Sequence, residues 1–454
     1  MCSRIPCAAV AALLVGLGLG TSPAAADDPS IPHERYTLPN GLEVILAPDS
    51  SVPLVAVNVW YHVGSGYEVY GKSGFAHLFE HMLFQGSQHV GEDKHFETLK
   101  IIGGDGVNGT TNLDRTNYFE VIPSNQLDTA LWLESDRMAF LLPLVTQKSL
   151  DNQIEVVRNE RRQRYDNVPY GKARFALFEA LYPEKHPYRF LTIGKHEDLT
   201  TASLDDVIGF FKTWYVPANA TLTLVGDFEP AAAKKQIEQW FGALPPSKKP
   251  EVLHVPAPRA RAERRTVEDT FAKQRQITWA WHSPANFAPG DAELDVLASA
   301  LTREGTGRLY KILVHEKQLA TSVGASQSSA TFSSIFAVTV TLRGDADLAA
   351  VEKIVTDELA RALREPIEQK EIDRVVTQRE ASAVWGLESQ MGRANRLQGY
   401  NHYLGDPDKL SWDLSRYRAV TPAAVQAAAT AYIDLKKPVV IVTMPAAAPA
   451  GGAP

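Results

Sequence analysis

Apolar and polar residues alternate along two stretches near the start of the chain. In "NGLEVIL", residues 40–46, every second residue from Leu42 is apolar, and valines repeat this spacing over residues 55–59. Because successive side chains of a strand point to opposite faces, the pattern predicts two half-buried strands. Asn40-Gly41 is the turn that leads into the first of them.

Helical spacing begins at Gly74 and returns over residues 124–165, where two helices are expected. Between these two helical regions, "FETLKIIGGDGVNGTTNLDRTNYFEVIP" predicts a helix end, a glycine-rich loop and a polar strand. Residues 199–228 then predict a capped helix, a turn and a strand. Ser203 is the expected N-cap, and two aspartates follow it in the first turn.

A second copy of this helix–strand unit lies near the C-terminus, in "AVTPAAVQAAATAYIDLKKPVVIVTMP". Ser203 and Thr421 are equivalent N-caps. Trp214 and Tyr432 also match, and they are the same number of residues apart as Ser203 and Thr421. A match at such long range predicts an internal duplication of one α/β unit rather than a short-period solenoid.

The duplication predicts an α+β fold of two homologous domains, each an antiparallel-rich sheet with helices packed on one face. The expected N-terminal domain spans residues 30–245 and the C-terminal domain residues 267–446, with "RQITWAWHSPA" as its first strand. A proline- and charge-rich linker at 246–266 joins them, and a flexible tail follows at 447–454.

The first 26 residues resemble no part of either domain. One basic residue precedes an apolar run, which ends in Ala24-Ala25-Ala26 before Asp27. This order predicts a cleaved Sec-type signal peptide and a periplasmic or secreted protein. A membrane anchor is the alternative, but the run is shorter than the roughly 20 residues needed to span a bilayer. No later stretch approaches that length, so no membrane span is expected after cleavage.

Composition excludes some chemistry. Both cysteines, Cys2 and Cys7, lie inside the signal segment, so the mature chain has no disulfide and no cysteine ligand for a metal. The net charge is −7 and no basic run occurs, which argues against a nucleic-acid partner.

The stretch "GFAHLFEHMLFQGS" places His77 and His81 four residues apart on a predicted helix, with Glu80 between them. Residues four apart share a helix face, so both rings can reach one ion. Glu80 lies close enough to take a proton from water activated by zinc. The order is the inverse of the common H-E-x-x-H motif of zinc proteases. Incidental histidines on a buried helix are the alternative, but uncompensated polar groups there would be costly.

A hydrolytic zinc site takes three protein ligands and keeps one open position. The third ligand is expected in the helical segment "LDNQIEVVRNERRQRYDNVPYGKA", which carries Glu155 and Glu160. The two are five residues apart and point in different directions, so only one of them is expected to bind. Spacing alone does not choose between them.

Five stretches together, "NGLEVIL", "VGSGYE", "GKSGFAHLFEHMLFQGS", "IGGDGVNGTTNLDRTNYF" and "VVRNERRQRYDNVPYG", resemble the pitrilysin/insulinase family of zinc metallopeptidases. The likeness is greatest to short members akin to the mitochondrial processing peptidase subunits. It covers nearly all of the mature chain, specifically in the first half and diffusely in the second. It implies that His77 and His81 bind Zn²⁺ and that Glu80 is the base. The "RNERRQ" context matches the family's distal ligand at Glu160, which leaves Glu155 as an outer-shell candidate.

The same resemblance implies a substrate-binding edge strand in "GGDGVNGTT". Asn108, Gly109 and Thr110 are the expected contacts, and Asn108 matches the position that holds the substrate backbone. Alanine is usual where this chain has Gly109. A peptide that adds as an extra strand is recognised mainly through its backbone, which implies broad specificity for unfolded peptides. Two alternatives remain: a phosphate-binding loop, and Asn108 as a turn former after Gly106.

The second copy has no matching histidine pair; "LDVLASALTREGTG" stands in its place. Family members often have a substrate-gripping tyrosine where this chain has Thr321, and Arg308 receives no assigned role. The long relatives enclose a chamber with four such repeats, so a closed chamber here implies a dimer. The missing tyrosine favours a heterodimer with a related subunit that lacks zinc. Three functions follow: a zinc endopeptidase, a non-catalytic subunit of a peptidase-like complex, and a zinc-dependent peptide-binding module.

Overall fold

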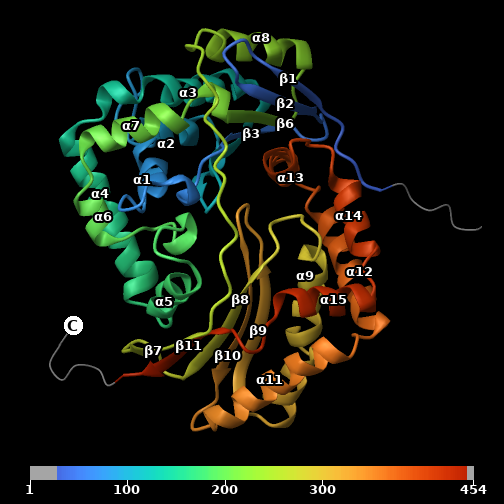
Figure 1. The fold of residues 1–454 in the computed structure, drawn as a ribbon. Coiled ribbons are helices and arrows are strands. Elements are labelled where there is room, and N and C mark those ends of the chain that lie inside the picture. Colours follow the sequence, from blue (N-terminus) through green and yellow to red (C-terminus); the bar gives the residue numbers. More distant parts are fainter. Residues whose placement is uncertain (1–27, 447–454) are drawn as a thin grey trace, which may run out of the picture.

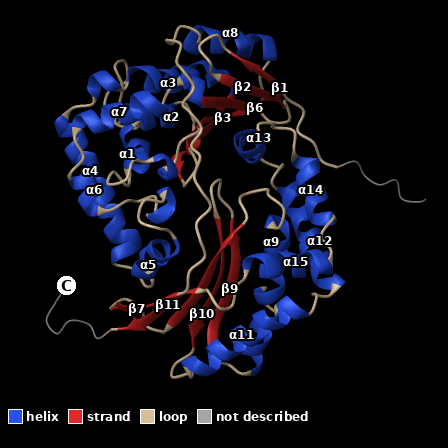
Figure 2. Ribbon diagram, viewed as in Figure 1, coloured by secondary structure: helices blue, strands red, loops and turns tan. Residues whose placement is uncertain are grey.

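The structure is a computed structural model that describes residues 28–446. Two lobes, each built on one β-sheet, lie one above the other in the view of Figures 1 and 2. The predicted signal segment and the tail at 447–454 lie outside the described residues. Among residues 28–446, no helix has both the length and the apolar character needed to cross a membrane.

The first domain is built on a six-stranded sheet with the order β1-β2-β6-β3-β5-β4. β2 and β6 run parallel, and the other neighbours are antiparallel. The strands are β1 (Glu34–Thr37), β2 (Glu43–Pro48), β3 (Leu54–Tyr61), β4 (Asp105–Thr111), β5 (Thr116–Pro123) and β6 (Ala220–Gly226). The antiparallel-rich sheet predicted from the alternation is confirmed.

Helices cover one face of this sheet and enclose the main core of the first domain. They are α1 (Phe75–Met82), α2 (Lys94–Ile101), α3 (Leu127–Phe140), α4 (Gln147–Arg161), α6 (His196–Thr200), α7 (Leu204–Trp214) and α8 (Pro230–Phe241). Ser203 caps α7 as predicted, because its hydroxyl accepts a hydrogen bond from the amide of Asp206.

The second domain repeats this plan. Its five-stranded sheet has the order β7-β11-β8-β10-β9, with β7 and β11 parallel, so the strands match β2, β6, β3, β5 and β4 in turn. They are β7 (Glu263–Asp269), β8 (Gln276–Ser283), β9 (Ala320–Ser328), β10 (Ser334–Leu342) and β11 (Val439–Pro445). β7 begins inside the stretch predicted as linker and precedes the expected first strand, which is β8. This edge strand was not predicted, because its sequence, "ERRTVED", is rich in charged residues.

Helices of the second domain cover one face of the second sheet. They are α9 (Asp291–Thr302), α10 (Arg308–Tyr310), α11 (Leu348–Arg364), α12 (Gln369–Trp385), α14 (Leu410–Arg418) and α15 (Pro422–Tyr432). Thr421 caps α15 and Pro422 occupies its first turn, as the repeat predicted.

Two helices cross between the domains. α13 (Gln390–Leu404), from the second half of the chain, packs Ala394 and Leu397 against the outer face of the first sheet. α5 (Gly171–Leu181), from the first half, covers the outer face of the second sheet in the same way. The prediction of helices on one face is therefore incomplete, because each sheet carries a helix of the other half on its second face. Consequently β3 is buried on both faces rather than half-buried.

Candidate metal centre

The helix α1 carries the histidine pair, and its start is fixed by two residues. Gly74, the N-cap, has φ +94°, a left-handed conformation that favours glycine. The Glu68 carboxylate accepts hydrogen bonds from the amides of Gly74 (2.9 Å) and Ala76 (2.8 Å). These amides have no partner within the helix, so Glu68 satisfies them and holds the first turn in place.

His77 and His81 converge on Glu160, which projects from α4. The Nε2 atom of His81 lies 3.1 Å from Oε2 of Glu160, and Nε2 of His77 lies 3.6 Å from the same oxygen. One potential ligand atom from each residue fits within a 4.8 Å group, and residues 28–446 hold no other such group of three. The four-residue spacing of His77 and His81 thus brings both rings to the same group, as predicted.

The structure separates the two glutamates that spacing alone could not. Glu160 faces α1, while its second carboxylate oxygen pairs with Arg164 at 2.8 Å. Glu155 does not join the group: its side chain is 55% exposed and pairs with Arg158. The predicted outer-shell position of Glu155 is therefore not brought to the metal group.

The electrostatics of the three residues suit a divalent cation. Burial lowers the pKa of His77 to about 4, so the ring is neutral and its Nε2 offers a lone pair. Burial opposes ionisation of Glu160, but the hydrogen bond from His81 and the neighbouring imidazoles and Arg164 lower its pKa overall. Two imidazoles and one carboxylate are a donor set that zinc takes in hydrolytic sites.

Glu80 lies beside this group and is held from the opposite side. The hydroxyl of Thr111 donates a hydrogen bond of 2.6 Å to Oε2 of Glu80, and burial raises the pKa of Glu80. Thr111 belongs to β4, two residues after Gly109. A Cβ at position 109 would lie 2.9 Å from Cγ of Glu80, so both residues face α1. Sequence reasoning missed Thr111, although the two-residue period of a strand places it on the face of Gly109.

The segment predicted as a glycine-rich loop is the edge strand β4. Asn108, Gly109 and Thr110 pair with β5, and β4 is the last strand of the sheet order. The interpretation of Asn108 as a turn former is therefore wrong. Its side chain is exposed, and its Oδ1 accepts from the amide of Gly109 at 2.9 Å. Thr110 is held instead by Arg115, which donates to the Thr110 carbonyl at 2.8 Å.

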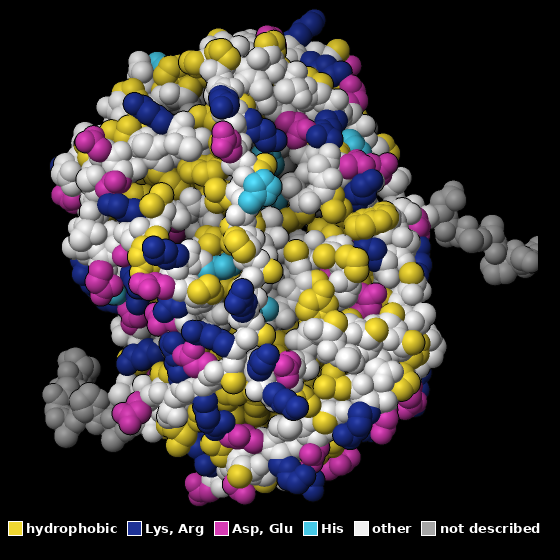
Figure 3. All heavy atoms as spheres, in the orientation of Figure 1, with side chains coloured by type: hydrophobic (Ala, Val, Ile, Leu, Met, Phe, Trp, Pro, Cys, Tyr) yellow, Lys and Arg dark blue, Asp and Glu magenta, His cyan; other side chains and the backbone are white. Residues whose placement is uncertain are grey.

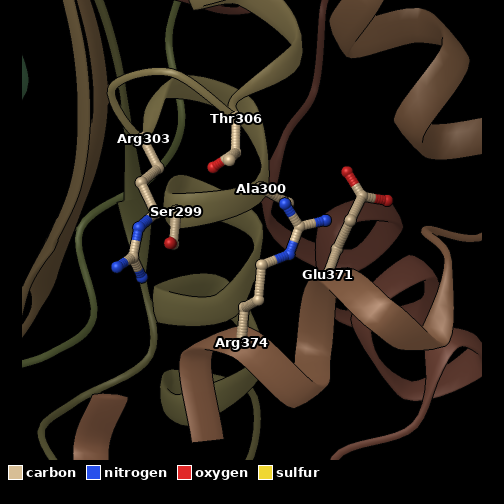
Figure 4. Close-up of a pocket in the computed structure, with 6 residues that line it drawn as sticks. All are labelled: Ser299, Ala300, Arg303, Thr306, Glu371 and Arg374. Carbon is tan, nitrogen blue, oxygen red and sulfur yellow. The ribbon is translucent and has the colours of Figure 1, made fainter. Parts of the chain in front are cut away.

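The second domain has no counterpart of the metal group among the described residues. Counted from the N-cap glycines of α1 and α9, the motif positions become Glu293, Val296 and Leu297. Glu293 caps its own helix, and the other two are buried in the core. Figure 4 shows the neighbouring pocket between α9 and α12, lined by Arg303 and Glu371 among others. It holds about 10 Å³, the space of one water.

Two further residues from the sequence have structural contacts in this domain. Arg308 forms a two-pronged ion pair with Glu371 on α12. The Thr321 hydroxyl, on β9, donates to Gln274 at 2.9 Å. The face in Figure 3 intersperses acidic and basic side chains, and several histidines lie near its middle, between the two lobes.

Known proteins resemble this chain over most of its length. It is 28% identical to the zinc protease PqqE of Helicobacter pylori, over 81% of this chain and 83% of that protein. It is 25% identical to YmxG of Bacillus subtilis, an uncharacterised zinc protease, over 82% and 88% of the two chains.

Solved structures share the fold. The crystal structure of a protease from Helicobacter pylori matches with a TM-score of 0.82 and 25% identity, covering 92% of this chain and all of that one. The periplasmic protease PqqL from Escherichia coli matches with a TM-score of 0.75 and 19% identity, over 92% of this chain and 48% of that one. That likeness concerns the fold alone.

Two family models match separate parts of the chain. The model of insulinase, peptidase family M16, matches residues 43–185, which include the histidine pair and Glu160. The model of the peptidase M16 inactive domain matches residues 201–379. Together the two stretches span more than half of the chain, and this chain belongs to the pitrilysin/insulinase family, peptidase family M16.

Proposed function

We propose that this chain is a zinc-dependent endopeptidase that hydrolyses extended or unfolded peptides after export to the periplasm or the medium. The observation that carries the proposal is the convergence of His77, His81 and Glu160, with Glu80 beside them on the same helix. A complete ligand set next to a further carboxylate is what hydrolysis at zinc requires.

The three ligand residues would hold the ion through Nε2 of each histidine and a carboxylate oxygen of Glu160. Zinc supplies Lewis acidity, which brings the pKa of water from 15.7 to about 7. Glu80 then takes a proton from the attacking water, whose oxygen bonds to the peptide carbonyl carbon. The same carboxyl returns this proton to the departing amide nitrogen as the C–N bond breaks. Thr111 keeps the Glu80 carboxylate pointed at this exchange.

The substrate would extend the first sheet. β4 is hydrogen-bonded only to β5 among the described strands, so its other edge is available to an extended peptide. Gly109 lies against Glu80 of α1 and leaves room for the Glu80 side chain. A peptide paired with β4 would therefore pass close to Glu80. Asn108, Gly109 and Thr110 would supply the contacts, mainly through the backbone.

A dimer fits the same picture. The metal group is confined to the first domain, and Thr321 is bound to its own domain by Gln274. We therefore infer that a second subunit completes the substrate chamber, and that a related subunit without zinc is the preferred partner. Full peptidase activity of the pure chain as a homodimer would contradict the heterodimer.

The test compares the purified chain with Glu80→Gln. We expect wild type to bind one zinc per chain and, alone or with a partner subunit, to cleave an unstructured fluorogenic peptide, and Glu80→Gln to keep the zinc while losing cleavage. Glu155→Gln is the matched control and should retain both, because Glu155 lies outside the group. If zinc-loaded wild type cleaves no peptide, alone or with a partner subunit, the chain is a non-catalytic peptide-binding subunit.

A further inference from the structure

A cavity of about 720 Å³ lies between the first domain, the linker and the C-terminal end of α13. Its walls include His62 after β3, the linker residues 249–252 and His402 on α13, but neither the metal ligands nor Glu80. Ligand pockets in proteins have volumes of about 300–1,000 Å³. The cavity is therefore a second place on this chain with room for a ligand.

A hydrogen-bonded relay forms its inner wall. The Thr221 hydroxyl donates to Glu43 at 3.0 Å, so it accepts from Nε2 of His62 at 2.9 Å. Nδ1 of His62 is then the acceptor for Nδ1 of His402, 2.7 Å away. The remaining nitrogen of His402, Nε2, consequently carries a lone pair.

The relay leaves one hydrogen-bond acceptor for a ligand. Among the described residues, nothing hydrogen-bonds Nε2 of His402, whose ring lines the cavity. Burial lowers the pKa of both His402 and His62, in agreement with neutral rings. A neutral imidazole nitrogen without a partner can accept a hydrogen bond from an N–H or O–H donor in the cavity.

The mouth of the cavity offers one free cation. Lys249 is exposed there and forms no ion pair with any described residue, whereas Arg35 is bound to Glu43 and to the Gly405 carbonyl. Glu251 also lines the cavity, so the field disfavours a polyanion such as a nucleotide. A single carboxylate that pairs with Lys249 meets less of that repulsion than a polyanion does.

An aromatic pair provides an apolar wall. Tyr67 and Trp214 both line the cavity and stand edge to face, with ring centroids 5.1 Å apart. Such a surface accepts an apolar or aromatic side chain.

We propose that this cavity binds a short peptide segment that ends in a free carboxylate. A backbone N–H of the peptide donates to Nε2 of His402, the carboxylate pairs with Lys249, and a side chain packs against Tyr67 and Trp214. The site lies where both domains and the linker meet, so an occupant would brace the two halves of the chain. This inference does not rest on peptide cleavage, since it concerns residues outside the metal group.

The test uses zinc-loaded Glu80→Gln protein, in which cleavage cannot consume the probe. The probe is N-acetyl-Ala-Ala-Phe as the free acid, compared by calorimetry with its C-terminal amide. We expect one molecule of the acid to bind per chain. The amide should bind about tenfold more weakly, since a charge-assisted hydrogen bond is lost. Lys249→Gln should cause the same loss for the acid, and the neighbouring Lys248→Gln should cause none.

Two more comparisons locate the binding. N-methylation of the backbone nitrogens, one at a time, should identify one N–H whose loss weakens binding about as strongly, and His402→Phe should abolish this dependence. Asn108→Ala, on the edge strand, should leave binding of the acid unchanged. No binding at millimolar acid, equal affinity of acid and amide, equal effects of the two lysine variants, or preferential binding of adenosine diphosphate would each overturn the proposal. None of these results bears on whether wild type cleaves peptides.

Discussion

The contact between β4 and Glu80, the proposed base, gives the sharpest test of how the proposed metal centre is organised. Thr111→Val removes a hydroxyl that lies 2.6 Å from Oε2 of Glu80, and replaces it with a methyl group of similar size. Valine is also β-branched, so it suits a strand as well as threonine does. The substitution therefore deletes the hydrogen bond to Glu80 and a longer contact of 3.4 Å with the Thr116 hydroxyl, and little else.

The expected loss follows from that bond. Removing a hydrogen bond to a charged group costs about 1.5–3 kcal/mol, and each 1.36 kcal/mol is tenfold in rate. If the contact orients Glu80 for proton transfer, kcat should fall between about tenfold and about 150-fold. KM and zinc content should stay near wild type, because Thr111 touches none of the three ligand residues.

Steady-state cleavage of a fluorogenic peptide measures the two constants, and atomic absorption measures the zinc. Thr111→Ser is the matched control, since it keeps the hydroxyl and should restore most of kcat. A Thr111→Val enzyme with wild-type kcat would refute the reasoning. So would a parallel loss of zinc and activity, which would mean that the strand supports the ion rather than the base.

Three further predictions test the framework around this site. Glu160→Gln should lower zinc content by atomic absorption far below that of Glu155→Gln; equal content in the two variants would remove Glu160 from the ligand set. Glu68→Ala should lower the free energy of urea unfolding by about 1–2 kcal/mol, because it leaves the first amides of α1 uncapped, and an unchanged midpoint would contradict this. The pKa of His62 falls from 6.5 to about 4 on folding, so the unfolded chain binds the proton first and stability drops as the pH falls through that range. Urea unfolding at pH 7.5 and 4.5 should show that His62→Gln removes about 2.5 kcal/mol of this acid-dependent loss, and a loss as large as that of wild type would contradict the prediction.

The histidine pair could be predicted from the sequence because its geometry is local. Four residues along one helix bring His77 and His81 to a common face whatever surrounds the helix. The third ligand could not be chosen in this way, since Glu155 and Glu160 lie on a separate helix. Only the packing of α4 on α1 turns Glu160 inward and leaves Glu155 in solvent.

The edge strand shows the opposite case, in which tertiary pairing overrides local preference. Four glycines within "GGDGVNG" favour a loop, yet residues 105–111 form β4 because β5 supplies their hydrogen-bond partners. A bulge between Asp105 and Asn108 absorbs the left-handed Gly106. Gly109, which stands where alanine is usual in the family, is the residue that makes room for Glu80.

The duplication was visible in the sequence, but its consequence for packing was not. Each copy places a helix after α4 or α12, and both helices leave their own sheet to cover that of the other copy. The apolar residues of α5 and α13 look the same whichever sheet they cover, so periodicity cannot reveal the exchange. Because a helix of the other half covers the second face of each sheet, this exchange fixes the position of one domain relative to the other. The His62–His402 contact, which joins β3 to α13, lies on this shared surface. A ligand in the neighbouring cavity would therefore act on the element that joins the domain with the metal group to the copy without it.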